Sequence, residues 1–191
     1  MLATLLLLFA QILLKPCTIE GVAGQAHCGT YRVWENRHTK QGRQLDLSVI
    51  VIDALKTPRQ PDPLFLIAGG PGDAPSFNAR FFSEAFADVR EHRDLVLVDL
   101  RGTGKSHPLT CPELAQPDAS GLLDDAILSV PALQKCKSRL QQTADLRQYT
   151  TEIAVDDLDE VRQALGYQQV NLYGTSYGTR VAQVYMRRHP A

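Results

Sequence analysis

The chain has 191 residues, of which 44% are hydrophobic and 21% charged, which is an ordinary composition for a globular protein. A chain of this length can form one domain with a buried core. The formal net charge of -1 leaves no basic excess to neutralise phosphates, which argues against nucleic acid as the main partner.

Residues 1–14 are almost wholly apolar. Such a run is too short to span a bilayer comfortably and is typical of the apolar part of a secretion signal. No basic residue precedes the run and no clear small-x-small cleavage site follows it, so a buried N-terminal helix is the alternative. We expect residues 1–16 to be a signal segment without a stable membrane span, and the protein to be exported to the periplasm or the extracellular medium.

The four cysteines support export, because disulfides persist in oxidising compartments. Four cysteines allow three connectivities, and the simplest is local pairing of Cys17 with Cys28 and of Cys111 with Cys136. Neither pair has the spacing of a zinc site, so we expect no metal. The alternative is a cytosolic protein with four buried thiols.

Apolar runs along the chain predict the strands of a sheet. The expected strands cover residues 30–35, 45–52, 64–68 and 95–98, and the last two of these runs are short and wholly apolar. Apolar residues spaced four apart predict a helix over residues 76–89.

The second half of the chain begins with residues 107–149, which are polar and irregular and are expected to form an excursion above the sheet. A helix is expected from Thr150, with Gly166 ending it. Its acidic residues are expected to form a solvated face rather than a metal site: Asp156, Asp157, Asp159 and Glu160. Strands that alternate with helices after an initial strand pair predict the α/β class, with a mostly parallel sheet covered on both faces.

The most informative stretch is residues 170–179, where an apolar run meets a sharp turn and a helical pattern follows. The turn reads Gly-Thr-Ser-Tyr-Gly over residues 174–178, which matches the Gly-x-Ser-x-Gly pattern of a nucleophile elbow. Ser176 is therefore the candidate nucleophile, and the N–H of Tyr177 is a candidate donor to an oxyanion. Residues 169–173 are expected to form a short buried strand before the turn.

Two further glycine-rich loops follow strand candidates. Residues 69–72 read Gly-Gly-Pro-Gly and fix a backbone with exposed N–H groups, as an oxyanion hole requires. Residues 99–106 read Asp-Leu-Arg-Gly-Thr-Gly-Lys-Ser. This second loop is not a nucleotide site, because Asp99 stands where a phosphate loop needs glycine and His107 occupies the third glycine position of the dinucleotide fingerprint.

Together these three motifs resemble the α/β-hydrolase superfamily, and most closely its proline iminopeptidase and tripeptidyl-aminopeptidase-like branch. Members of that branch carry a Gly-Gly-Pro-Gly loop, an Asp-x-Arg-Gly-x-Gly-x-Ser loop and often a Gly-x-Ser-Tyr-Gly elbow, and all three are present here. The resemblance covers residues 28 to 190, with Ala68 as a departure, because many members have histidine there.

The resemblance implies that Ser176 is the nucleophile and that the N–H groups of Gly70 and Tyr177 are the oxyanion donors. It implies no metal and no organic cofactor. It also implies a chain order of serine, then an acid, then a histidine.

The acid and the histidine of this triad have no candidate in the sequence. No Asp or Glu follows Ser176, and His189 lies along the same expected helix, about 20 Å away at the rise of an α-helix. The earlier histidines fall outside the expected order and are expected at the surface or in loops: His27, His38, His92 and His107. We therefore expect residues 17–191 to be the N-terminal part of an α/β-hydrolase domain, truncated after the nucleophile helix.

These observations predict an exported serine hydrolase, an aminopeptidase that releases short N-terminal units from small peptides through an acyl-enzyme on Ser176. An esterase or lipase acting on small acyl esters is an alternative, because the same machinery cleaves both bonds. A catalytically incomplete fragment or binding protein is a further alternative, because two triad members are missing. The 191-residue chain alone is expected to be inactive.

Overall fold

The computed structural model describes residues 12–114 and 130–190. Its centre is a six-stranded sheet with the strand order β1-β2-β3-β5-β4-β6. The strands are β1 (Lys15–Cys17), β2 (Ala26–Trp34), β3 (Gln44–Ile52), β4 (Leu64–Ile67), β5 (Leu95–Val98) and β6 (Asn171–Gly174). Strand β1 pairs with β2, β2 with β3 and β3 with β5, and all three pairings are antiparallel. Strand β4 pairs parallel with both β5 and β6. The described sheet is therefore mixed: three of its five strand pairings are antiparallel, so the parallel part, at the β6 end, is smaller than the mostly parallel sheet expected from the sequence.

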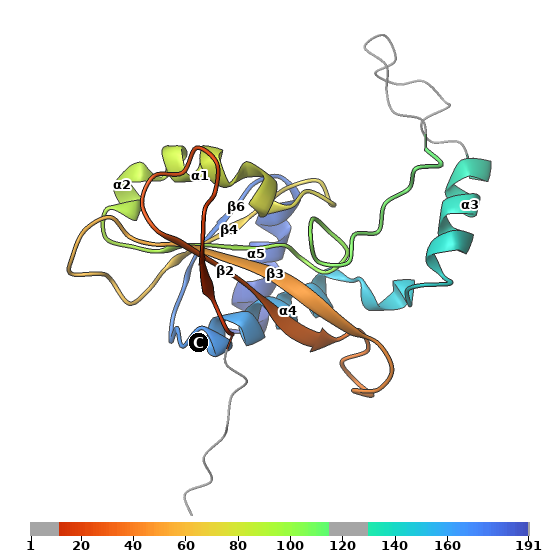
Figure 1. The fold of residues 1–191 in the computed structure, drawn as a ribbon. Helices are drawn as coiled ribbons and strands as arrows, with labels where there is room; N and C mark the ends of the chain where they lie inside the picture. The colour runs from red at the N-terminus through yellow and green to blue at the C-terminus, as the bar shows by residue number, and fades with distance from the viewer. Residues whose placement is uncertain (1–11, 115–129, 191) are drawn as a thin grey trace, which may run out of the picture.

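Helices cover both faces of this sheet (Figure 1). The helical segments are η1 (Pro75–Asn78), α1 (Ala79–Ala85), α2 (Ala87–Arg90), α3 (Val130–Leu140), η2 (Leu146–Gln148), α4 (Thr151–Ala164) and α5 (Tyr177–Arg188). One apolar core lies between the sheet and the buried side chains of α4 and α5. A second core lies on the opposite face, where Ala79 and Phe82 of α1 pack. This layering confirms the expected α/β class.

The expected elements are present with shifted bounds. The helix expected over residues 76–89 is divided into η1, α1 and α2, because two residues leave the helical conformation: Asn78 at φ -111° and ψ 20°, and Phe86 at φ -110° and ψ 29°. The Phe86 ring packs edge-on against Tyr173 of β6, with ring centroids 4.6 Å apart. Strand β2 begins before residue 30, because all of its residues pair with β3.

Strand β6 is not the buried strand that residues 169–173 predict. Asn171 is exposed and the other three residues of β6 are only half-buried. Among the described residues β6 pairs with β4 alone, so it forms an edge of the sheet. A groove of about 600 Å³ runs beside it, lined by residues that include Val170, Leu172 and Met186.

The excursion over residues 107–149 is more regular than its composition suggests. Its described part contains α3, which projects from the body of the molecule (Figure 1). Only Cys136 and Leu140 of this helix are buried. So short an apolar pattern does not stand out from a polar sequence, which explains why the helix is not predicted.

The two local disulfides expected from the sequence are present, joining Cys17 to Cys28 and Cys111 to Cys136. The expected signal segment falls mainly on residues 1–11, which lie outside the described residues. Its last residues belong to β1, where Lys15 lies opposite Cys28 in β2. In the described residues, none of the helices is long and apolar enough to cross a membrane.

Candidate active site

The turn between β6 and α5 has the geometry of a nucleophile elbow. Ser176 has φ 49° and ψ -119°, a conformation that side-chain-bearing residues rarely adopt, and α5 begins at the next residue. A Cβ on Gly174 would overlap the carbonyl oxygen of Gly178, and a Cβ on Gly178 would overlap that of Ile67. Both glycines are therefore required by close backbone contacts. Ser176 is exposed on this turn, and its side chain caps no N–H of α5.

The glycine loop over residues 69–72 lies directly against this serine. A Cβ built on Gly69 would lie 3.1 Å from the Cβ of Ser176. Gly70 has φ 98°, which favours glycine. Within the described residues, the backbone N–H groups of Gly70 and Tyr177 donate to no backbone acceptor. The loop and the start of α5 thus leave two unpaired N–H groups beside an exposed hydroxyl group.

The side chain of Tyr177 links the elbow to α4. Its hydroxyl group lies 2.8 Å from Oγ1 of Thr151, the first residue of that helix. This hydrogen bond joins the starts of α4 and α5 beside the nucleophile. The sequence contains no signal for it, because the two residues are far apart in the chain and each is unremarkable in its own segment.

The loop over residues 99–106 uses its polar groups inside the scaffold. The carboxylate of Asp99 is fully buried and accepts hydrogen bonds from N (3.2 Å) and Oγ (2.8 Å) of Ser76 and from N of Lys105 (3.0 Å). Oγ of Ser106 donates to the Asp99 carbonyl at 2.7 Å and accepts from N of Ser48 at 2.8 Å. This loop therefore anchors the chain that follows the glycine loop.

Arg101 of the same loop makes a buried ion pair that its sequence context does not predict. Its guanidinium donates to both carboxylate oxygens of Asp157, at 2.6 and 2.8 Å, and the two side chains are 1% and 2% exposed. Arg37 also donates to Asp157, at 2.7 Å. The expectation that the acidic residues of α4 form a solvated face is wrong for Asp157 and Asp159, which are buried. Their charges are matched by arginines instead of water.

The far end of α5 holds His189 away from the nucleophile. His189 Nε2 lies 3.1 Å from Oδ1 of Asp156, and its Nδ1 lies 3.4 Å from Oδ2 of Asp159. The hydroxyl group of Tyr185 donates to Asp159 at 2.9 Å. Burial, followed by this hydrogen bond, raises the pKa of Tyr185 above its ordinary value. This cluster ties α5 to α4 and serves packing.

Two further histidines, His27 and His92, also bond to groups away from the nucleophile. His27 Nδ1 lies 3.1 Å from Oδ1 of Asp53, and His92 Nδ1 lies 3.1 Å from the carbonyl oxygen of Pro58. No histidine or carboxylate of the described residues hydrogen-bonds to the side chain of Ser176. The described site therefore contains a hydroxyl group and two N–H groups, without a base in contact.

Comparison with known proteins agrees with this geometry. The family model of the alpha/beta hydrolase fold matches residues 62–191, and the chain belongs to that family. Two curated relatives come from bacteria. The Escherichia coli protein named "Putative hydrolase YuaR" is 31% identical over 132 residues, which are 67% of this chain and 26% of that protein. The tripeptidyl aminopeptidase of Streptomyces coelicolor is 29% identical over 172 residues, which are 83% of this chain and 32% of that protein.

These matches confirm the resemblance to the aminopeptidase-like branch. A solved structure of an Agrobacterium vitis protein, named "Putative hydrolase", shares the fold with a TM-score of 0.51 at 13% identity, covering 85% of this chain and 45% of that one. The chain spans about a third or less of the length of these two curated relatives.

Proposed function

We propose that this chain provides the nucleophile and the oxyanion donors of a serine peptidase that releases short units from the N-termini of small peptides. The observation that carries the proposal is Ser176, exposed at a positive φ with the glycine loop against it. Positive φ at a residue with a side chain costs free energy, and such strain gathers at functional sites. The name of the Streptomyces coelicolor relative supports a peptide substrate.

The proposed reaction begins with attack of Ser176 Oγ on the scissile carbonyl carbon. The carbonyl oxygen then carries negative charge and accepts hydrogen bonds from the N–H groups of Gly70 and Tyr177, which have no backbone acceptor among the described residues. Collapse of this intermediate releases the amine and leaves an acyl-enzyme on Ser176, which water hydrolyses. Because no base contacts Ser176 among the described residues, we propose that the base that takes the serine proton, and the acid that orients it, come from residues outside the described ones.

We also propose that the protein works in an exported, oxidising environment. The two disulfides support this placement, because reducing compartments keep thiols free. Free thiols at these four cysteines in protein taken from the periplasm or medium would argue against it.

The test uses the longest natural polypeptide that contains this chain, assayed against fluorogenic aminoacyl and tripeptidyl amides and small acyl esters. We expect Ser176→Ala to abolish amide cleavage and labelling by a fluorophosphonate probe. The matched control is Ser138→Ala, which removes an exposed hydroxyl group on α3 and is expected to change neither. Equal turnover by Ser176→Ala and the parent would reject the assignment. Ester cleavage without amide cleavage would identify an esterase instead.

The 191-residue chain expressed alone provides a second test. Without a base in contact, Ser176 keeps its proton and is a weak nucleophile at neutral pH, so we expect no useful hydrolysis. Serine-dependent turnover by this chain as a folded monomer would show that one of its own histidines acts as the base.

A further inference from the structure

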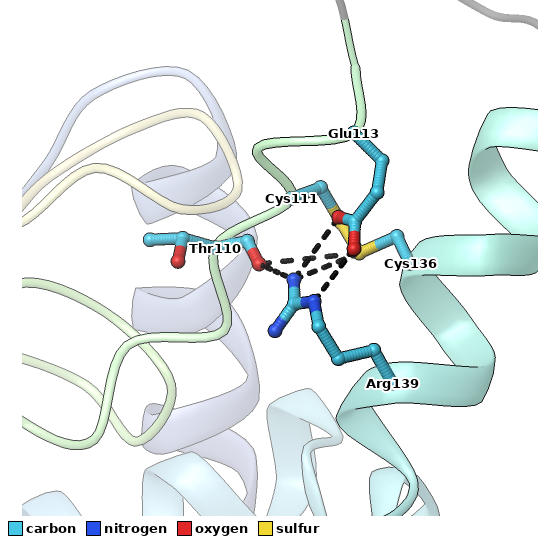
Figure 2. Close-up of a disulfide and its surroundings, with 5 residues drawn as sticks. All are labelled: Thr110, Cys111, Glu113, Cys136 and Arg139. Carbon is cyan, nitrogen blue, oxygen red and sulfur yellow. Dashed lines mark hydrogen bonds and ion pairs between the residues drawn. A yellow bond between two sulfur atoms is a disulfide. The ribbon is translucent and has the colours of Figure 1, made fainter.

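The Cys111–Cys136 disulfide lies beside an arginine and a carboxylate (Figure 2). Arg139 of α3 donates to the two carboxylate oxygens of Glu113, at 2.6 and 3.1 Å. It also donates to the carbonyl oxygen of Thr110 at 2.6 Å, and Nη2 of the same guanidinium lies 3.8 Å from Sγ of Cys136. The charged groups therefore distinguish the two sulfur atoms of the bridge.

The two cysteines also differ in their exposure. Cys136 is 1% exposed on the inner side of α3, whereas Cys111 is half-buried in a segment without regular secondary structure. A thiolate that opens a disulfide must reach one sulfur atom from outside, and the other sulfur atom leaves. A thiol from solution therefore reaches Cys111 more readily than Cys136.

The leaving sulfur atom departs as a thiolate, and a nearby cation lowers the pKa of a cysteine thiol. Arg139 offers that cation, with an N–H group, to Cys136. Glu113 opposes it, because its carboxylate lies within 4.8 Å of both sulfur atoms. The hydrogen bond from Arg139 lowers the pKa of Glu113 to about 2, so this carboxylate is charged at neutral pH. The stabilisation of a Cys136 thiolate therefore depends on the balance of these two side chains.

We propose that Cys111 is a thiol-modification site, at which a low-molecular-weight thiol attacks the bridge to form a mixed disulfide. The attacking thiolate sulfur bonds to Sγ of Cys111, the bond between the cysteines breaks, and its electron pair leaves on Sγ of Cys136 beside Arg139. A second thiolate can then attack the sulfur of the small thiol in the mixed disulfide. This step releases a small-molecule disulfide and completes the two-electron reduction of the bridge.

The other bridge provides an internal reference. Cys17 and Cys28 are both half-buried, pack against the apolar core, and join the paired strands β1 and β2. Among the described residues no hydrogen bond or ion pair reaches either of their sulfur atoms. Neither exposure nor charge selects a leaving sulfur there, so this bridge is expected to open more slowly and without preference.

Opening of the Cys111–Cys136 bridge would affect the excursion over residues 107–149. Cys111 and Cys136 tie residues 110–113 to α3, and among the described residues the other polar contacts between these segments are the hydrogen bonds made by Arg139. Thiol modification at Cys111 would therefore loosen α3 and leave the sheet and the elbow intact. The inference does not depend on the proposed hydrolase function.

The decisive experiment maps the first thiol adduct. The intact chain is treated briefly with reduced glutathione, quenched with acid, alkylated with N-ethylmaleimide and analysed by peptide mass spectrometry. We expect glutathione on Cys111 and maleimide on Cys136, with about a tenfold preference for this arrangement. Adducts shared equally, a preference for Cys136, or faster opening of Cys17–Cys28 would overturn the proposal.

Charge variants test the cause of the preference. Glu113→Gln leaves the Arg139 charge unopposed, so we expect opening about three- to tenfold faster, whereas Arg139→Gln should slow it by a similar factor. The matched control is Arg147→Gln, an exposed arginine on the same excursion that pairs with Asp145. Unchanged rates in both charge variants would overturn the role of Arg139. If Arg139→Gln does not fold, the adduct map of the parent chain still decides.

Discussion

The loop over residues 99–106 and the elbow over residues 174–178 are built from similar residues and behave in opposite ways. Both are rich in glycine, both contain a serine, and both follow a strand of the parallel part of the sheet. In the first, Asp99 and Ser106 are fully buried, and both side chains are hydrogen-bonded. In the second, Ser176 is exposed at a positive φ, and its side chain caps no N–H group.

This difference separates the residues that stabilise the fold from those available for chemistry. A buried polar group is tolerated when its hydrogen bonds are made, and loop 99–106 satisfies that condition. A strained, exposed hydroxyl group with unpaired N–H groups beside it adds nothing to stability, and this combination is expected of a functional site. The motif residues of one family can therefore either stabilise the fold or be available for chemistry. Their burial and hydrogen bonding show which of the two roles each residue has.

The largest effect is expected for the buried ion pair that Arg101 of the 99–106 loop makes with Asp157. Arg101→Ala leaves the Asp157 carboxylate buried with Arg37 as its remaining partner, so we expect unfolding free energy to fall by about 3–5 kcal/mol. The measurement is chemical denaturation followed by circular dichroism. Arg147→Ala is the control, because this arginine is 86% exposed, and its removal should leave the midpoint unchanged. A loss as small as the control's would show that the buried pair contributes little.

The second change breaks the elbow by steric overlap. Gly178→Ala places a Cβ against the carbonyl oxygen of Ile67, so β4 and α5 must move apart. We expect a loss of about 1–3 kcal/mol, as for other overpacked sites, together with loss of probe labelling at Ser176 in the longer polypeptide. Gln183→Ala, at an exposed position of the same helix, is expected to preserve both. Normal labelling of a stable Gly178→Ala protein would refute the close-contact argument.

Much of the sheet could be predicted because its strands are short, continuous apolar runs. The runs over residues 64–68 and 95–98 correspond to β4 and β5, which are buried along their whole length. The elbow could be predicted because only a narrow set of residues fits its backbone. Periodicity and local sterics are properties of neighbouring residues, so a sequence displays them directly.

The remaining features depend on partners that are distant in the chain. Asp157 looks like one more acid in a charged helix until Arg101, from a loop more than fifty residues away, is brought against it. Thr151 gains its contact with Tyr177 only when α4 and α5 pack together. The exposure of β6 likewise depends on which strands pair with it, and its own sequence does not reveal that.

A smaller effect is expected where the scaffold meets the elbow. Tyr177→Phe removes the hydroxyl group that bonds to Thr151, and a hydrogen bond of this kind contributes about 0.5–1.5 kcal/mol. Thr151→Val should cost a similar amount. The double variant should cost less than the two single losses together, because both remove the same interaction. Strict additivity in denaturation experiments would show that the contact contributes no coupling.

The smallest effect is expected at the nucleophile itself. Ser176→Gly removes the side chain that makes a φ of 49° unfavourable, and this relief is about 1–2 kcal/mol. Glycine also loses about 0.5–1 kcal/mol of backbone entropy on folding, so the net expectation is a gain of about 0–1.5 kcal/mol in unfolding free energy.

The control is Ser176→Ala, which removes the hydroxyl group and keeps the Cβ. It should therefore remain as strained as the parent and show little change in stability, although both variants should lose probe labelling in the longer polypeptide. Denaturation of all three proteins separates the two effects. A stabilised glycine variant beside an unchanged alanine variant would locate the strain in the backbone of the nucleophile. A glycine variant destabilised by about 0.5–1 kcal/mol, which is its backbone-entropy cost alone, would mean that the elbow stores no strain and that the surrounding glycines impose its geometry at no local cost.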